Sequence, residues 1–271
     1  MASNDKSVEF LYGTKFGRAL LRISLALQLP KLLGFFLRTP LSHFYIKKFI
    51  EKNGIDMSPW SGQKFCSFND FFTRKKEIEF DSDPSHLISP ADSLLSVFPI
   101  EENSTFYIKG ADYSLTDFFG TDEFNKKFNG GLCLVFRLCA ADYHRYCYID
   151  GGHVGENHFI KGKLYSVQPL PLEKFRVFTK NRRSWTILET QNFGTVAQVE
   201  VGAFSVGGIK NNHSNYDFKK GEEKGYFDLH GSTIVLLLEK GKISLTEEIK
   251  NRTSGGTEFR VKCGQYIADK N

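Results

Sequence analysis

Cysteine and long apolar runs are scarce in this 271-residue sequence, and each shortage argues against a class of protein. The five cysteines are odd in number and include no Cys-x-x-Cys pair, so a disulfide framework is not expected. We expect reduced thiols in a cytosolic compartment instead. Residues 1–9 lack the apolar core of a signal peptide. The longest apolar stretch near that end, Ala19–Leu29, is interrupted by Arg22 and is too short to span a bilayer.

Several motifs of catalysis and ligand binding are also missing. There is no Gly-x-Ser-x-Gly segment, which argues against an α/β-hydrolase. Gly202, Gly207 and Gly208 do not form a phosphate-binding loop. A group of cysteines and histidines in the middle of the chain matches no closed zinc pattern, so no metal is expected; its members are Cys139, His144, Cys147, His153 and His158.

Positive charge is concentrated at the beginning of the chain. The whole sequence has a net charge of +5, whereas residues 1–50 alone carry +6. This segment is also rich in leucine, isoleucine and phenylalanine, and Phe16, Leu20, Ile23 and Leu27 would share one face of a helix. Two interpretations stay open: a helix that lies on anionic lipid, or a helix that packs on its own domain. Nucleic acid is not an expected partner, because no recognised binding module surrounds the basic residues.

The pattern changes after about residue 60. Residues 1–60 contain three expected helices, at 12–29, 31–37 and 42–53. Residues 61–271 contain short β-branched and aromatic runs separated by glycines, and strands are expected at 132–138, 159–167, 185–190, 195–201 and 234–238. The charged segment 219–225 is expected to be a solvated loop. The sequence therefore predicts an α+β fold that is predominantly β, with a helical, basic segment (1–60) before a β-rich catalytic domain (61–271).

Three polar segments interrupt this apolar strand pattern. Ser89–Ser93 contains a lone carboxylate, Asp92, in a tight turn. Arg137–Cys147 is dense in groups that titrate or donate hydrogen bonds, among them His144. Gly231-Ser232-Thr233 directly precedes a buried apolar run, where it could be only a turn that leads into a strand. Together the three segments supply a hydroxyl, an imidazole and a carboxylate, which are the groups needed to activate a serine nucleophile.

In their order along the chain, the motifs Ser-Pro-Ala-Asp (89–92), Asp-Tyr-His-Arg-Tyr (142–146) and Gly-Ser-Thr (231–233) resemble phosphatidylserine decarboxylase, a pyruvoyl-dependent enzyme family. Further segments that are similar to this family lie at 68–74, 161–167, 189–194, 201–203 and 220–227. No single segment is decisive. Their shared order along most of the chain makes the resemblance specific.

The resemblance implies a proenzyme that cuts itself between Gly231 and Ser232 into a large chain (1–231) and a small chain (232–271). Ser232 would become a covalent pyruvoyl group, the only cofactor. Phosphatidylserine would form a Schiff base with it and lose carbon dioxide to give phosphatidylethanolamine. A lipid substrate also gives the basic N-terminal segment a purpose, so a peripheral position on the cytoplasmic face of a membrane is expected.

Residue by residue, the resemblance assigns Ser232 as the pyruvoyl precursor, Asp92 as the carboxylate of the relay that activates it, and His144 as the first histidine of the family's Asp-Tyr-His-Arg-x-His pattern. The second histidine of that pattern is Cys147 here, and Ser93 and His230 replace common glycines. A thiol cannot simply replace imidazole as a base. One alternative therefore remains, a non-catalytic lipid-binding homologue that is never processed; otherwise His144 or His230 would act as the base.

Overall fold

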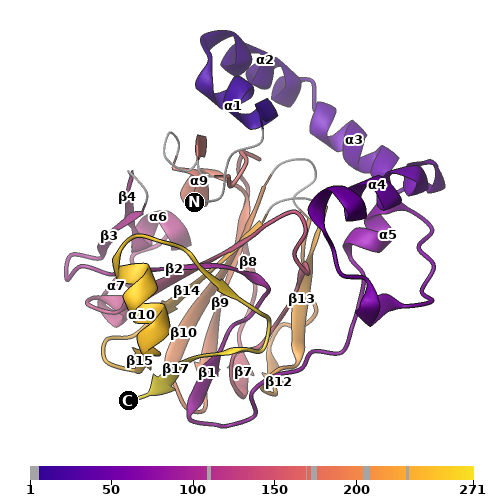
Figure 1. Cartoon of the computed structure of the whole chain (residues 1–271). Coiled ribbons are helices and arrows are strands. Elements are labelled where there is room, and N and C mark those ends of the chain that lie inside the picture. Colours follow the sequence, from indigo (N-terminus) through magenta and orange to yellow (C-terminus); the bar gives the residue numbers. More distant parts are fainter. Residues whose placement is uncertain (1–5, 109–110, 169, 172–175, 204–207, 230–231) are drawn as a thin grey trace.

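The computed structural model describes residues 6–108, 111–168, 170–171, 176–203, 208–229 and 232–271. Helices dominate as far as residue 72, and strands dominate after residue 85, so the predicted α+β fold with a predominance of β structure is confirmed (Figure 1). The helical elements are α1 (Lys6–Gly13), α2 (Lys15–Ala26), α3 (Leu29–Leu37), η1 (Pro40–His43), α4 (Phe44–Asn53), η2 (Ser58–Trp60), α5 (Phe68–Phe72), α6 (Leu115–Phe119), α7 (Asn125–Phe128), α9 (Val177–Lys180) and α10 (Glu247–Ser254).

The strands form one large antiparallel sheet and three small ones. The large sheet has the order β12-β7-β9-β10-β14-β5-β2-β16, and β8 pairs with β9; the small sheets are β11-β13-β6, β1-β17-β15 and β3-β4. The strands are β1 (His86–Ile88), β2 (Ser93–Pro99), β3 (Thr105–Ile108), β4 (Ala111–Ser114), β5 (Leu132–Leu138), β6 (Arg145–Cys147), β7 (Gly152–Val154), β8 (His158–Ile160), β9 (Arg183–Thr190), β10 (Thr195–Gly202), β11 (Gly208–Asn211), β12 (Tyr216–Phe218), β13 (Glu223–Asp228), β14 (Ser232–Leu238), β15 (Ile243–Leu245), β16 (Phe259–Val261) and β17 (Tyr266–Lys270).

Four of the five expected strands are confirmed as β5, β9, β10 and β14. The fifth expectation, a strand over 159–167, is wrong beyond Ile160, where β8 ends. The chain there makes a single parallel bridge between Lys163 and Asn181. Gly162 lies against the backbone of residues 180–182, where an added Cβ would come within 2.5 Å of the Lys180 carbonyl oxygen. This close approach of two backbones replaces the extended ladder that the β-branched and aromatic residues favour.

The central strand β14 is buried on both faces. Ile234, Leu236 and Leu238 pack into one apolar cluster, and Val235 and Leu237 pack into another on the opposite face. This alternation follows from the period of two along a strand. Because both faces are covered, the sequence of β14 is a continuous apolar run, which is what made the strand visible in the sequence.

A buried ion pair lies between the large sheet and the small sheet β11-β13-β6. Lys224 Nζ donates to Glu200 Oε1 at 2.7 Å, and both side chains are at most 1% exposed. Asn211 of β11 bonds both members of the pair. The expectation that 219–225 is a solvated loop is therefore wrong at its C-terminal end, where the chain enters β13. Charge alone suggested solvent, but a buried Lys with a carboxylate and an amide partner is stable inside the protein.

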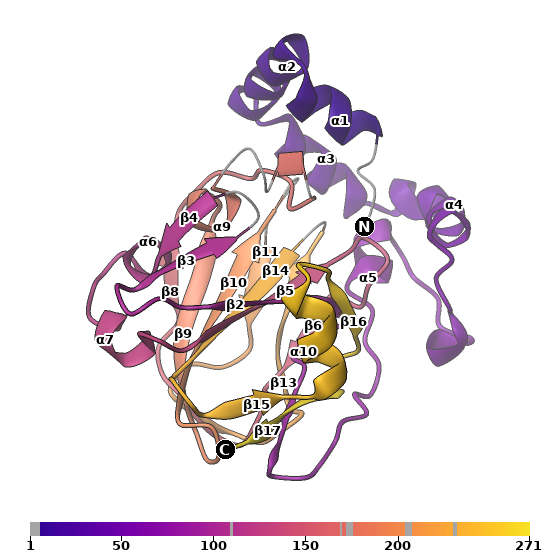
Figure 2. The ribbon, with the colours of Figure 1, turned by 60° about the vertical axis from the view of Figure 1, so that its left-hand side comes forward.

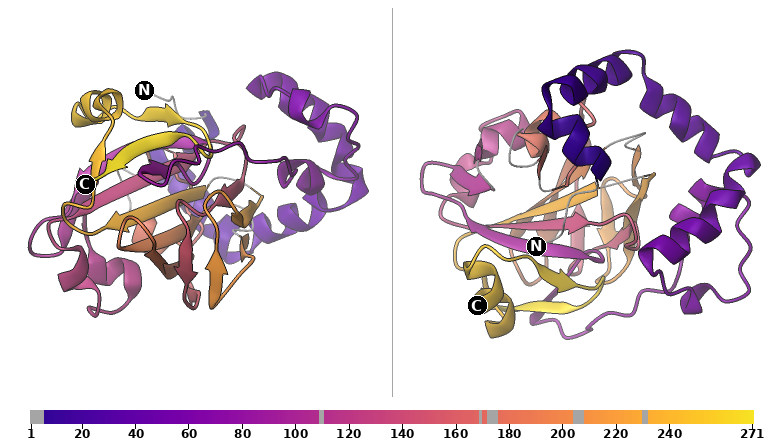
Figure 3. Two further views of the ribbon diagram at one scale, coloured as in Figure 1. Left: turned by 90° about the horizontal axis from the view of Figure 1, so that it is seen from below. Right: turned by 45° about the horizontal axis from the view of Figure 1, so that its top comes forward.

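The N-terminal helices extend from one end of the strands and arch away from the β-rich body (Figures 2 and 3). α1 is anchored through Tyr12, whose hydroxyl accepts a hydrogen bond from the Ser166 amide at 2.9 Å. Burial raises the pKa of Tyr12 to about 12, so this side chain stays a neutral phenol.

α2 presents an apolar face to solvent. The side chains of Phe16, Leu20, Ile23 and Leu27 are 73%, 44%, 55% and 62% exposed. Packing of this face on its own domain, the second interpretation of the sequence, is therefore wrong. In the described part of the chain no single helix is long and apolar enough to cross a membrane; α2 and α3 together meet the length and composition but are bent by 64°.

α3, α4 and α5 pack against the β-rich part in a third apolar cluster. It joins residues of the helical segment to two residues beside the predicted site, Tyr143 and Leu229. The members with buried side chains are Leu37, Ile46, Trp60, Phe65, Phe68, Phe71, Phe72, Tyr143 and Leu229. The helices therefore form one wall of the site region, and the boundary at residue 60 remains a prediction.

Candidate active site

Ser232 is the first residue of β14 and is completely buried. It pairs with Leu138 of β5 on one side and with Gly202 of β10 on the other. By the alternation of β14, its side chain lies on the same face as Ile234, toward the cluster that contains Cys147. Its Oγ has no hydrogen-bond partner among the described residues. Buried hydroxyl groups normally have a partner, whereas the Ser232 hydroxyl is not committed to any hydrogen bond with the described residues.

Asp92 lies in the turn immediately before β2. Its Oδ1 accepts a hydrogen bond from the Cys263 amide at 2.8 Å, and the Lys262 ammonium lies 3.7 Å from Oδ2. Asp92 also lines an open cavity of about 820 Å³ together with Lys76, Lys262 and Cys263. The Cys263 amide and the Lys262 ammonium therefore fix the position of this carboxylate.

His144 is buried in the turn between β5 and β6. Its Nδ1 lies 2.8 Å from the carbonyl oxygen of Asp142, and its ring lies 4.0 Å from the ring of Phe72 on α5. A carbonyl can only accept, so Nδ1 carries the hydrogen and Nε2 is the basic nitrogen of the neutral ring. Phe72 thus holds one face of the imidazole, a contact between residues far apart in the sequence.

The same turn is held by a second carboxylate, Asp142. Its Oδ2 accepts from the Cys139 amide at 2.6 Å, and its Oδ1 pairs with Arg260 of β16 at 2.8 Å. Burial raises the pKa of Asp142, while the Arg260 guanidinium opposes that shift. Some of the polar residues between 137 and 147 therefore hold this turn in its conformation.

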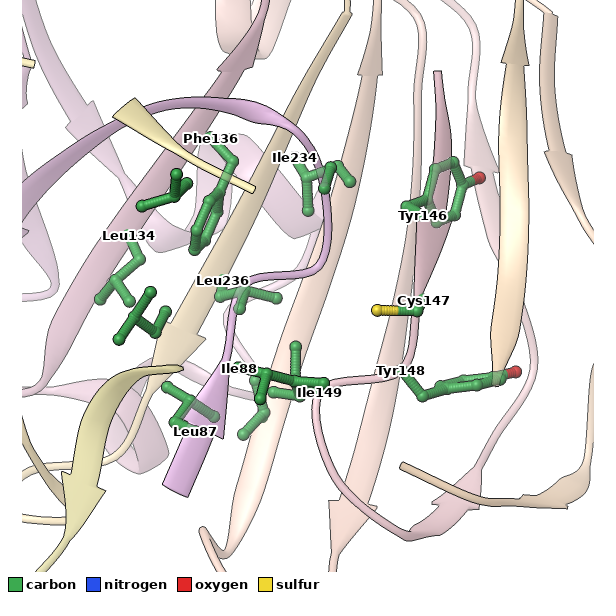
Figure 4. Close-up of a cluster of buried hydrophobic side chains, with 14 of the residues drawn as sticks. Leu87, Ile88, Leu134, Phe136, Tyr146, Cys147, Tyr148, Ile149, Ile234 and Leu236 are labelled. Carbon is green, nitrogen blue, oxygen red and sulfur yellow. The ribbon is translucent and has the colours of Figure 1, made fainter. Parts of the chain in front are cut away.

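Cys147 is buried at the end of β6 and belongs to a pair of thiols. Its Sγ lies 3.6 Å from Cys263 Sγ and 3.8 Å from the Ser89 carbonyl oxygen. In Figure 4 the sulfur points to the side of β6 on which Leu236 and Ile149 lie, while the rings of Tyr146 and Tyr148 point the other way. The hydrogen bond that Cys263 donates to Cys147, together with burial, raises the pKa of Cys263 well above its ordinary value, so Cys263 is a neutral thiol at physiological pH.

The strand register brings the three predicted segments to one end of the large sheet. Val261 pairs with Ser93, Leu94 with Arg137, and Leu138 with Ser232. Ser93 and Ser232 are therefore two strands apart, about 10 Å at the usual spacing of neighbouring strands. The turns that carry Asp92 and His144 both begin at this end, next to the start of β14.

The predicted relay is only partly assembled. Asp92 and Cys147 meet at a common neighbour, Cys263, but no hydrogen bond joins them in the described part of the chain. The Nδ1 of His144 is bonded to the carbonyl of Asp142 rather than to Asp92. Gly231 and His230 lie outside the described residues. Ser232 itself belongs to the strand rather than to a turn before it.

Sequence reasoning missed Cys263 and Phe72, which contact Cys147 and His144. Cys263 follows β16, and a lone cysteine beside a lysine carries no local signal of a site. Phe72 lies in the segment 68–74, which resembles the family, but nothing in that segment indicates a contact with His144. Both reach the site only through tertiary packing.

The fold and the site define an enzyme of β-rich architecture whose candidate nucleophile, a buried serine, begins a central strand. Sequence comparisons agree, since a sequence model of the family described as phosphatidylserine decarboxylase matches residues 68–269. "Phosphatidylserine decarboxylase proenzyme 2" of Clostridium acetobutylicum is 41% identical over 268 residues, which cover 97% of this chain and 92% of that protein. "Phosphatidylserine decarboxylase proenzyme" of Clostridium tetani is 38% identical over 276 residues, covering 99% and 93%. The chain therefore belongs to the phosphatidylserine decarboxylase family, which confirms the resemblance.

Proposed function

We propose that this chain is a self-processing enzyme that decarboxylates phosphatidylserine to phosphatidylethanolamine. The observation that carries the proposal is the Ser232 hydroxyl, which is buried at the start of β14 without a described partner in a chain that matches proenzymes over nearly its full length. A nucleophile for an internal cut needs this combination of a fixed backbone and an uncommitted oxygen.

The proposed cut is an acyl shift followed by elimination. Ser232 Oγ attacks the Gly231 carbonyl, the C–N bond breaks, the nitrogen of Ser232 takes a proton, and an ester links the two halves. Loss of the Ser232 α-proton with the Gly231 carboxylate leaves dehydroalanine. Addition of water releases ammonia and leaves a pyruvoyl group at position 232. The first step needs a proton acceptor for Oγ, and the imidazole of His144 is the candidate that lies among the described residues.

The surroundings of Ser232 fit such a group. Gly202 faces it on β10 without a side chain, and Thr233 contributes a second buried hydroxyl with no described partner. When formed, the pyruvoyl group supplies an electrophilic carbonyl and an electron sink for loss of carbon dioxide from an amino acid headgroup. The chain would hold the group in place through the β14 ladder, exclude water through the apolar cluster around Ile234, and provide acid–base groups from the turns of Asp92 and His144.

An intact-mass measurement of the purified protein tests the proposal. We expect two chains, residues 1–231 and residues 232–271, and the smaller should lack a free amino terminus and react with hydroxylamine or borohydride. A single chain without activity would favour the alternative, a lipid-binding homologue that is not processed because Cys147 replaces the expected histidine. A single uncut chain with full activity would contradict the pyruvoyl mechanism.

We further propose that α2, α3 and α4 place the enzyme on the cytoplasmic face of a membrane as a peripheral protein. Exposed apolar side chains recur along these helices, and residues 1–50 carry a net charge of +6. The exposed large apolar residues of this segment are Phe10, Phe16, Leu20, Ile23, Leu27, Leu29, Leu32, Leu33, Phe35, Leu41, Phe44 and Tyr45. An apolar face flanked by lysine and arginine binds anionic lipid surfaces.

Replacing Phe16 and Ile23 together by serine is expected to weaken binding to vesicles that contain phosphatidylserine by at least about tenfold. Each side chain contributes about 1.5–3 kcal/mol when it is fully buried, and about 1.4 kcal/mol corresponds to a tenfold change. Sedimentation with vesicles at several salt concentrations measures the effect. Tyr107→Ser is the matched control, because Tyr107 is 61% exposed but lies on β3. Equal binding of the double variant and the native protein would contradict a lipid-facing role for α2.

A further inference from the structure

Arg38, the residue that follows α3, contacts the strand that leads to the proposed cut. Arg38 is the C-cap of α3, and its Nη2 donates to Oδ2 of Asp228, the final residue of β13. The Asp228 side chain is 10% exposed, and its Oδ1 is buried with no partner among the described residues. Arg38 is therefore the cation that this carboxylate faces.

A second contact joins the same two segments. Leu37 of α3 and Leu229 belong to one apolar cluster, and Leu229 is completely buried. Leu229 has a φ of 51°, in the left-handed region that a leucine rarely adopts. Leu37 and Arg38 thus belong, respectively, to the apolar cluster that contains Leu229 and to the ion pair with Asp228.

Ser232 is fixed independently. β14 begins at Ser232 and is hydrogen-bonded to β5 and β10 from that residue onward. The proposed cut therefore falls in a span of three residues between two anchors, Asp228 on one side and Ser232 on the other. An internal attack requires the two reacting atoms to be about 3–3.5 Å apart, and a misplacement of about 1 Å can lower the rate 10²-fold.

We propose that Arg38 is a positioning residue for self-cleavage: it holds Asp228, and through it the residues before Ser232, in the place that the attack requires. The proposal rests on the self-processing proposed above. α3 also carries exposed apolar residues. The helix that is proposed to contact lipid is therefore the one whose C-cap, Arg38, pairs with Asp228. Arg38 is 42% exposed, but the Asp228 side chain is only 10% exposed, so loss of the arginine leaves a largely buried carboxylate without its cation. We therefore expect slower cleavage together with some loss of stability, and the test measures both.

The test follows conversion of freshly translated proenzyme into two chains, in a cell-free system without vesicles. Arg38→Ala is expected to lengthen the half-time at least about tenfold, and Arg38→Lys, which restores the cation, should recover part of the rate. Combining Arg38→Asp with Asp228→Arg should cleave faster than either single change. Arg252→Ala is the matched control, since it removes an exposed arginine from the distant helix α10. Thermal unfolding of each variant in a Ser232→Ala background reports on the fold.

The outcomes separate the two proposals. An uncut native chain would overturn self-processing itself. A native chain that is cut, together with Arg38→Ala cut at the same rate, would overturn the role of Arg38 alone. Should Arg38→Ala fail to fold, Asp228→Asn decides, because it removes the ion pair and keeps the shape of the side chain: slower cleavage supports the proposal, and the native rate overturns it.

Discussion

Replacing Ser232 by alanine is expected to leave one chain of 271 residues with no decarboxylase activity. The substitution removes only Oγ, which is the attacking oxygen of the proposed cut and later leaves with the Gly231 carboxylate. Without Oγ neither the ester nor the dehydroalanine that precedes the proposed pyruvoyl group can form. Because Oγ has no described partner, no buried hydrogen bond is lost. Removing an unsatisfied buried polar group is nearly neutral or stabilising, so thermal unfolding should occur at the native temperature or above it.

Gel electrophoresis and intact mass measure this result, and Ser96→Ala supplies the control. Ser96 is a buried serine of β2, in the same sheet, and no catalytic role is assigned to it. Its alanine variant should be cut as the native chain is. A cut Ser232→Ala protein would show that the nucleophile lies elsewhere and would overturn the assignment of this residue.

The second large effect concerns position 147. If the missing base is an imidazole, Cys147→His should accelerate conversion to two chains by about 10²–10⁴-fold, the usual contribution of general-base catalysis. An imidazole is larger than a thiol, and Cys263 Sγ lies only 3.6 Å from the sulfur it would replace. The substitution is therefore best made together with Cys263→Ala, which opens space and keeps the main-chain amide that Asp92 accepts from.

Pulse-chase measurement of proenzyme conversion distinguishes the possible bases. Cys263→Ala alone measures the effect of the added space without the imidazole. Asp92→Asn should remove the gain, because an amide does not stabilise an imidazolium as a carboxylate does. If His144 acts as the base in the native sequence, His144→Ala should stop maturation there. The same change should be tolerated in the Cys147→His background. Rapid native maturation that Cys147→His leaves unchanged would show that position 147 is not the base.

Several strands of the large sheet could be predicted because the pattern of apolar residues in each one reflects its burial. β14 and β10 are buried on both faces. The Ile234–Leu238 part of β14 is a continuous apolar run, and β10 is rich in valine but is interrupted by Gln198 and Glu200. The start of β14 was less visible, since Ser232 and Thr233 are polar yet belong to the strand. A strand with two buried hydroxyls at its end looks like a turn until its neighbours are known.

The site was predictable as three separate segments but not as an arrangement. Asp92, His144 and Ser232 were singled out from their local context and from the family resemblance, and their roles remain predictions. The contacts of Cys263 with Cys147, and of Phe72 with His144, join residues separated by 116 and 72 positions. Lys224 shows the same limit, because its burial depends on Glu200 from another strand. Such pairings are set by the register between strands and by helix packing, which a local pattern does not encode.

The central position of β14 also affects whether the protein could refold after the proposed cut. β14 makes seven residue pairs with β10 and seven with β5. Residues 232–271 further supply β15, β16, β17 and α10. While the chain is continuous, folding is a unimolecular reaction. If the chain is cut before Ser232 as proposed, unfolding would release two fragments, and their reunion would depend on concentration and carry the cost of lost translational freedom. The mature enzyme would therefore remain folded because it unfolds slowly. It would acquire this kinetic stability when the uncut chain folds, and could not readily regain it after the cut.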